Sequence, residues 1–155
     1  MTVAEYIVGQ LVNYGVKFVF GIPGGPSIPY LEAFRAAGIN FILTSHESSA
    51  GIMADVSARL TGIPGCCHAT FGPGATNIST GTGYAYLDRS PLLVLTSKMP
   101  NKMKNRTVQM NIDHQILFGP ITKKSFRLTT DNAGEIMKDA FFRLKWSFYP
   151  MENLT

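Results

Sequence analysis

The chain has 155 residues, which is enough for one domain with a sizeable core. Hydrophobic residues make up 45% and charged residues 15%, a composition that excludes an intrinsically disordered protein. Because no apolar run reaches membrane-spanning length and the N-terminus lacks a signal-peptide pattern, we expect a cytoplasmic protein with no membrane partner. The net charge of +4 comes without any nucleic-acid-binding signature, so we expect no nucleic-acid partner.

Strand and helix patterns alternate from the N-terminus onward. Thr2 to Glu5 form a capping box, which predicts a first helix that ends near Gly15. The elements expected next are a strand at 17–20, a helix at 27–37, a strand at 40–43, a helix at 46–60, a strand at 65–70, a helix at 75–87 and a continuous apolar strand at 91–96. This alternation predicts an α/β fold with a doubly wound, mostly parallel sheet flanked by helices.

The C-terminal third is less regular. After a basic loop at 98–111, we expect a short helix at 113–117, a strand at 121–126 and a last helix at 132–145 capped by Asp131 or Asn132. A further strand should then complete the sheet, but residues 146–155 contain Pro150, which disfavours a central strand. The final strand therefore reads as missing or altered, within a single domain of residues 1–155.

Two glycine–proline loops flank one acidic residue. The loops are GIPGG at 21–25 and TFGPGATN at 70–77, and Glu47 lies between them in the sequence. Each falls where a strand gives way to a helix, and such positions share one crevice in an open parallel sheet, which predicts a ligand site. The loops match neither a P-loop nor a dinucleotide fingerprint, and the histidines lack metal-ligand spacing, so we assign no metal ligand. Glu47 is the candidate reactive group; an acid that merely stabilises a helix N-terminus is the alternative.

Five segments carry a family resemblance. FGIPGG, SHESSAGIMADVSARLTGIPG, TFGPGATNISTG, YAYLDRSPLLVLT and GPITKKS resemble the pyrimidine-binding (PYR) domain of thiamine diphosphate enzymes. The similarity is strongest to the group containing acetolactate synthase, pyruvate oxidase and benzoylformate decarboxylase. It runs from about residue 2 to about residue 145, whereas residues 146–155 diverge.

The resemblance implies roles for particular residues. Glu47 would be catalytic, through a hydrogen bond to N1′ of the cofactor aminopyrimidine that prepares the cofactor to attack a 2-oxo acid. Asp55, Arg59 and Asp88 match family positions with a structural role, either capping or pairing. The cofactor-binding residues would be Pro23, Gly24, Glu47, Thr70, Gly72, Pro73 and Asn77.

The chain also departs from the family. Relatives often carry a glutamine that faces the active site where this chain has Met110, with Gln109 one residue earlier. The pyrophosphate-binding (PP) domain, whose Gly-Asp-Gly motif and asparagine hold Mg²⁺ and the diphosphate, does not occur within the 155 residues. Thiamine diphosphate would therefore be shared with a PP domain, and Mg²⁺ would be bound there and not by this chain.

Two interpretations of function follow. In the first, the chain is the PYR half of a 2-oxo acid decarboxylase or acetolactate synthase-like enzyme, a lyase or transferase that works as an oligomer. Its partner would be a PP-domain chain or further copies of itself, and we do not expect activity alone. In the second, it is a truncated, catalytically inactive PYR-domain protein that acts as a binding or regulatory module.

Overall fold

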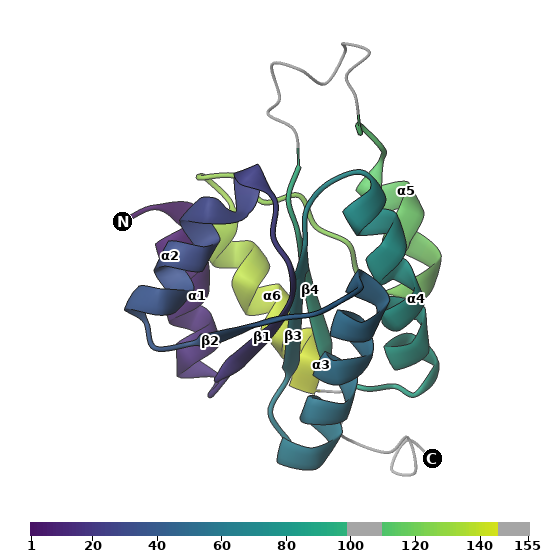
Figure 1. Ribbon diagram of the computed structural model, residues 1–155. Coiled ribbons are helices and arrows are strands. Elements are labelled where there is room, and N and C mark those ends of the chain that lie inside the picture. The colour runs from purple at the N-terminus through teal and green to yellow at the C-terminus, as the bar shows by residue number, and fades with distance from the viewer. Residues whose placement is uncertain (99–109, 146–155) are drawn as a thin grey trace.

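A four-stranded parallel sheet lies between two layers of helices (Figure 1). The computed structural model describes residues 1–98 and 110–145. The strands are β1 (Phe18–Ile22), β2 (Asn40–Leu43), β3 (Gly65–Ala69) and β4 (Leu92–Thr96), in the order β2-β1-β3-β4. All three pairings are parallel, so the predicted α/β fold class is confirmed.

The helices divide into two layers, one on each face of the sheet (Figure 1). The first layer contains α1 (Val3–Asn13), α2 (Ile28–Ala36) and α6 (Ala133–Lys145); the second contains α3 (Glu47–Thr61), α4 (Pro73–Leu87) and α5 (His114–Phe118). Short 3-10 turns at Gly25–Ser27 and Gly119–Ile121 lead into or out of these helices. The connections through α2 and α4 lie on opposite faces, which makes the sheet doubly wound.

Each layer has its own core, and β3 lies between them. All five residues of β3 are buried. Because successive strand side chains point to opposite faces, Cys66 packs with the α1 and α6 layer while Cys67 packs with the α3 and α4 layer. Burial raises the pKa of the Cys66 thiol to about 12. Both cysteines are free, buried thiols that fill space in the core.

The last predicted strand, residues 121–126, is wrong. After the turn at Gly119–Ile121 the chain continues in an extended path to residue 129 without forming a ladder with any described strand. The β propensity of the run favours a strand, but a strand needs a neighbour within hydrogen-bonding distance. A cavity separates this segment from β4 instead. The expected fate of the final strand concerns residues 146–155, which lie outside the described part of the chain.

An ionic cluster ties α3 to the end of α4. Arg59 contacts Asp55 at 2.7 Å and Asp88 at 3.2 Å. Asp55 is fully buried, so Arg59 supplies the charge partner that a buried carboxylate requires. The predicted structural pairing of these three residues is confirmed.

Helices α3 and α4 approach each other at two glycines. A methyl group at Gly81 would lie 2.7 Å from the Gly51 Cα and 2.7 Å from the Ser48 carbonyl oxygen. A methyl group at Gly51 would lie 2.8 Å from the Gly81 Cα. The contact is backbone against backbone, so neither helix can yield by rotating a side chain. It fixes the separation of the two helices that carry Glu47 and Asn77 near their N-termini.

Gly81→Val should destabilise the protein by about 1–3 kcal/mol, because the added atoms must push the two backbones apart. Gly9→Ala in α1 is the matched control, since nothing lies within 4 Å of its added methyl group. That change should stabilise the helix by about 0.5–1 kcal/mol. Urea unfolding monitored by circular dichroism measures both. Equal effects of the two substitutions would mean that the α3–α4 contact is not a close one.

Candidate functional site

The three loop elements singled out in the sequence follow three adjacent strands. The loop 21–25 follows β1, Glu47 follows β2 after a short connection, and the loop 70–77 follows β3. In the sheet order β2-β1-β3 these strands are direct neighbours, so the loops lie side by side at the carboxyl ends of the strands. The structure thus brings the predicted residues to the carboxyl end of a parallel sheet, where such folds bind ligands.

Glu47 is a buried carboxylate with one side-chain partner. Glu47 is the first residue of α3 and is only 8% exposed. The preceding residue, His46, is the N-cap, and its ring accepts a hydrogen bond from the Ser48 amide. The Asn77 amide donates a hydrogen bond of 3.0 Å to Oε2 of Glu47. The Ser48 hydroxyl in turn donates to the Asn77 backbone carbonyl at 2.8 Å. The N-terminal parts of α3 and α4 therefore hold Glu47 in place, close to a positive helix end.

Glycine at 24 and 74 lets the backbone approach this carboxylate. A methyl group at Gly74 would lie 3.0 Å from the Thr70 side chain and 3.4 Å from Oε1 of Glu47. A methyl group at Gly24 would overlap the Thr70 hydroxyl. Gly24, Thr70, Gly74 and Glu47 therefore pack closely together across the three loops. A larger residue at Gly24 would collide with Thr70, and one at Gly74 would press against Thr70 and Glu47.

The turn into α4 uses Gly72 and Pro73 in demanding positions. Gly72 has φ +66, which a residue with a side chain rarely adopts, and Pro73 occupies the first turn of α4. A methyl group at Gly72 would lie 2.5 Å from Cβ of Met110, which itself has φ +68. Met110 thus packs on the 70–77 loop. Gln109, the alternative for the family glutamine, lies outside the described residues.

Pro23 is half-buried beside Gly24. Behind this loop lies a buried pair, Ser27 and His68, that the sequence analysis did not predict. The Gly24 amide donates to the Ser27 hydroxyl at 3.0 Å, and that hydroxyl lies 2.7 Å from Nε2 of His68. Ser27 and His68 are 0% and 1% exposed. The pair ties the 21–25 loop to β3. The sequence feature that could have indicated this pair is His68, a polar residue inside an otherwise apolar strand. Because strand side chains alternate, His68 points to the face opposite Cys67.

Burial lowers the pKa of His68 to about 4. The imidazole is therefore neutral at physiological pH and shares one hydrogen bond with Ser27. Since a neutral ring is what the buried site accommodates, protonation of His68 opposes folding.

Among the described residues, neither a metal-binding cluster nor the cavity beside β4 coincides with these loops. The described residues contain no cluster of three or more His, Cys, Asp or Glu side chains that could hold a metal ion. A cavity of about 1330 Å³ lies alongside β4, and none of the seven predicted site residues lines it. Within the described ranges, no helix is long and apolar enough to cross a membrane.

Comparison with known proteins shows the family. The model of the thiamine pyrophosphate enzyme, N-terminal TPP binding domain, matches residues 1–117, and the chain belongs to this family. The resemblance drawn from the loop motifs is confirmed.

The relatives include large-subunit synthases and a decarboxylase. The chain is 43% identical over 125 residues to a probable acetolactate synthase large subunit of Methanocaldococcus jannaschii, covering 81% of this chain and 21% of that protein. It is 38% identical over 142 residues to the acetolactate synthase isozyme 1 large subunit of Escherichia coli, covering 90% and 25%. A probable 2-ketoarginine decarboxylase of Pseudomonas aeruginosa is 46% identical over 97 residues, covering 63% and 17%. The chain thus spans a quarter or less of the length of these relatives.

The buried His68 gives a pH prediction. Its pKa of about 4 in the folded protein lies below the ordinary value of 6.5, so the unfolded chain takes up the proton first as pH falls. Stability from this group is complete above pH 6.5 and is lost progressively down to about pH 4, by roughly 3 kcal/mol in all. His68→Gln should lose this part of the pH dependence of the unfolding free energy.

Chemical denaturation at several pH values provides the measurement. His46→Gln, a substitution of the exposed N-cap histidine, is the control and should keep the pH dependence of the parent protein. The same pH dependence in His68→Gln and the parent would contradict the assignment of this stability to His68.

Proposed function

We propose that this chain supplies the pyrimidine-binding half of a thiamine diphosphate-dependent enzyme that acts on a 2-oxo acid, with Glu47 as the carboxyl that activates the cofactor. One observation carries the proposal. A buried glutamate at the start of α3 is gripped by Asn77 on one side and faced by the glycine-built surface of the 24 and 70–77 loops on the other. A glutamate that only stabilised a helix N-terminus would not need a side-chain amide from a second helix to orient its carboxyl.

The residues present fit an aminopyrimidine. Oε2 of Glu47 accepts the Asn77 amide, while no hydrogen bond found among the described residues reaches Oε1. Oε1 faces Gly74, where even a methyl group would stand 3.4 Å away. An acceptor of this kind, beside flat backbone at Gly24 and Thr70, suits a planar heterocycle whose ring nitrogen exchanges a proton with a carboxyl.

When bound, thiamine diphosphate supplies a carbon nucleophile and an electron sink for reactions of 2-oxo acids. The chain's own part is to orient the pyrimidine and to hold a proton at Oε1 of Glu47. Asn77 fixes the carboxyl plane by its hydrogen bond to Oε2. Pro23, Gly24, Thr70, Gly72 and Pro73 border the ring and keep water from Glu47, whose burial strengthens the hydrogen bond it makes.

The proposed site is shared with a second domain. The chain spans only 21% and 25% of two synthase relatives, and the described residues offer no metal-binding cluster. We infer that a PP domain outside these 155 residues holds the diphosphate and Mg²⁺, either in another chain or in another copy's polypeptide. That domain would largely select the 2-oxo acid, and it would also decide whether the enzyme acts as a lyase or as a transferase. A cytoplasmic location suits such an enzyme.

Glu47→Gln should fold normally yet fail to activate the cofactor. The amide keeps the size and the contact with Asn77 but cannot exchange a proton at Oε1. In a complex with a PP domain from a thiamine diphosphate enzyme, the rate of hydrogen–deuterium exchange at C2 of the cofactor should fall by about 10²–10⁴-fold. Nuclear magnetic resonance of acid-quenched samples measures this rate.

Glu32→Gln is the matched control, because Glu32 is exposed and, in the described part of the chain, forms its ion pair with Arg35. It should leave the exchange rate unchanged. Retention of the parental rate by Glu47→Gln in a folded complex would overturn the catalytic assignment. Failure of the parent complex to accelerate exchange at all would favour the alternative of an inactive binding or regulatory module.

Helix α3 presents the surface most suited to self-association. Ile52, Met53, Val56 and Leu60 are all exposed on it, at 39–81% of their surface. Val56→Glu should shift the protein toward monomer in sedimentation equilibrium if copies pair through this face. Leu43→Glu, at the exposed edge strand β2, is the control and should not. A parent protein that is monomeric at high concentration would remove homo-oligomer formation from the proposal.

A further inference from the structure

Gly24 is held by Ser27 through both of its backbone polar groups. The Ser27 amide donates to the Gly24 carbonyl at 2.9 Å, and the Gly24 amide donates to the Ser27 hydroxyl at 3.0 Å. These two bonds close the 3-10 turn Gly25–Ser27 that follows the loop. Because the peptide groups on both sides of Gly24 are bonded, the face that Gly24 turns toward Thr70 is fixed as well.

The Ser27 hydroxyl needs an acceptor for its own proton. Ser27 is fully buried, and its oxygen already accepts the Gly24 amide. A buried hydroxyl proton without an acceptor would destabilise the fold. Among the described residues, Nε2 of His68, at 2.7 Å, is the acceptor that this proton reaches. The neutral His68 ring therefore carries its proton on Nδ1.

Aromatic side chains from two neighbouring elements set the plane of the His68 ring. The ring centroids of Tyr30 in α2 and Phe41 in β2 lie 5.8 Å and 6.3 Å from that of His68. Such packing is nearly the same for the two orientations of an imidazole that differ by half a turn. The hydrogen bond to Ser27 selects the orientation in which Nε2 faces the loop.

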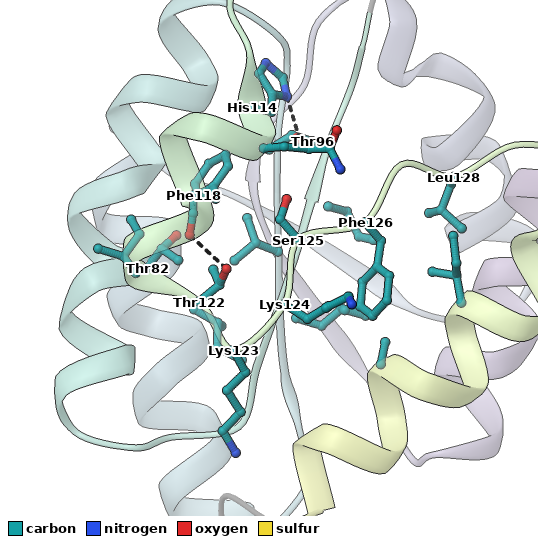
Figure 2. Close-up of a pocket in the computed structure, with 18 of the residues that line it drawn as sticks. Thr82, Thr96, His114, Phe118, Thr122, Lys123, Lys124, Ser125, Phe126 and Leu128 are labelled. Carbon is teal, nitrogen blue, oxygen red and sulfur yellow. Dashed lines mark hydrogen bonds between the residues drawn. The ribbon is translucent and has the colours of Figure 1, made fainter.

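Packing alone does not account for a histidine at this position. His68 borders the cavity beside β4 (Figure 2), as do Leu93 and Leu95, its apolar neighbours on that face of the sheet. Nδ1 of His68 is sealed from solvent, and its contact with the Leu95 backbone falls short of a good hydrogen bond. A leucine would avoid this loss of stability. The favourable contact that offsets it is the bond to Ser27, and through Ser27 the histidine acts on Gly24.

The Gly24 backbone and the Glu47 carboxyl are fixed by separate hydrogen bonds. The first depends on Ser27 and His68, and the second depends on Asn77. Loss of the Ser27–His68 bond should therefore displace Gly24 and leave the Glu47 carboxyl in place.

We propose that His68 is a positioning residue for the cofactor, which acts through the Ser27 hydroxyl to hold Gly24 against the pyrimidine ring. This role rests on the function proposed above, in which Gly24 borders that ring. His68 itself touches no reacting atom. By fixing the loop before the ring arrives, it reduces the ordering that binding requires. Its loss should therefore weaken cofactor binding more than it slows proton exchange on the bound cofactor.

Hydrogen–deuterium exchange at C2 of thiamine diphosphate separates these two effects. It is measured over a range of cofactor concentrations, with Mg²⁺, in the complex with a PP domain. His68→Leu removes the acceptor of the Ser27 proton and should raise the half-saturating concentration by about tenfold, with a maximal rate within about threefold of the parent. His68→Gln places an amide oxygen near the position of Nε2 and should restore the parental half-saturating concentration. Glu47→Gln should show the opposite pattern, a lower maximal rate.

Phe141→Leu is the control for a loss of core packing. Phe141 is buried and stacks on Tyr14, with 3.7 Å between ring centroids. Its substitution should lower the melting temperature and leave the half-saturating concentration unchanged. Ser27→Ala should match His68→Leu, and the double variant should be no worse than Ser27→Ala alone, because both changes break the same chain of bonds. Ser27→Ala also carries the test if His68→Leu does not fold.

The chain without cofactor gives a second readout. Long-range proton–nitrogen correlation spectra should place the His68 proton on Nδ1. Amide exchange at Gly24 should accelerate by about tenfold in His68→Leu and stay at the parental rate in Phe141→Leu, because only the first change frees the Ser27 hydroxyl.

Three outcomes overturn this role while the proposed function stands. One is a half-saturating concentration that stays parental in both His68→Leu and Ser27→Ala. Another is a fall in the maximal rate alone, which would mean that His68 acts on Glu47. The third is a His68 proton found on Nε2. A parent complex that never accelerates exchange at C2 would instead remove the proposed function, and the role of His68 with it.

Discussion

The contact between Gly51 and Gly81 is the constraint on which the candidate site depends. It brings α3 and α4 together backbone to backbone, with 2.7 Å between the position of an added methyl group and the facing Cα. Glu47 and Asn77 lie near the N-termini of these helices, and their hydrogen bond of 3.0 Å joins residues 30 positions apart. A wider helix separation would leave the buried Glu47 carboxyl without its amide partner. An unsatisfied buried polar group destabilises the fold, and here it would be the residue proposed to activate the cofactor.

The candidate site is a polar group held next to tightly fixed backbone. Oε2 of Glu47 accepts the Asn77 amide, and Oε1 faces Gly74. The cavity beside β4 lies on another part of the fold, because none of the predicted site residues lines it. This arrangement suits the proposed site, in which a second domain covers the carboxyl.

Most of the framework could be predicted because it rests on local patterns. The Thr2–Glu5 capping box forms as expected, and the apolar run after Pro91 is β4. The prediction of a strand at 121–126 was wrong, because a strand forms only beside a neighbouring strand and local β propensity carries no information about such a neighbour. The Ser27–His68 pair was missed because the hydrogen bond joins positions 41 residues apart. The roles of Glu47 and of the six other predicted cofactor-binding residues stay predictions.

Calorimetric titration of thiamine diphosphate with Mg²⁺ tests the central claim most directly. The account predicts no measurable binding to this chain alone and micromolar binding when a PP domain from a thiamine diphosphate enzyme is present, as expected for a site divided between two domains. Tight binding to the chain alone that disappears in Glu47→Gln would contradict the divided site. Absence of binding with the PP domain, in a complex shown to form by sedimentation, would contradict the cofactor assignment itself.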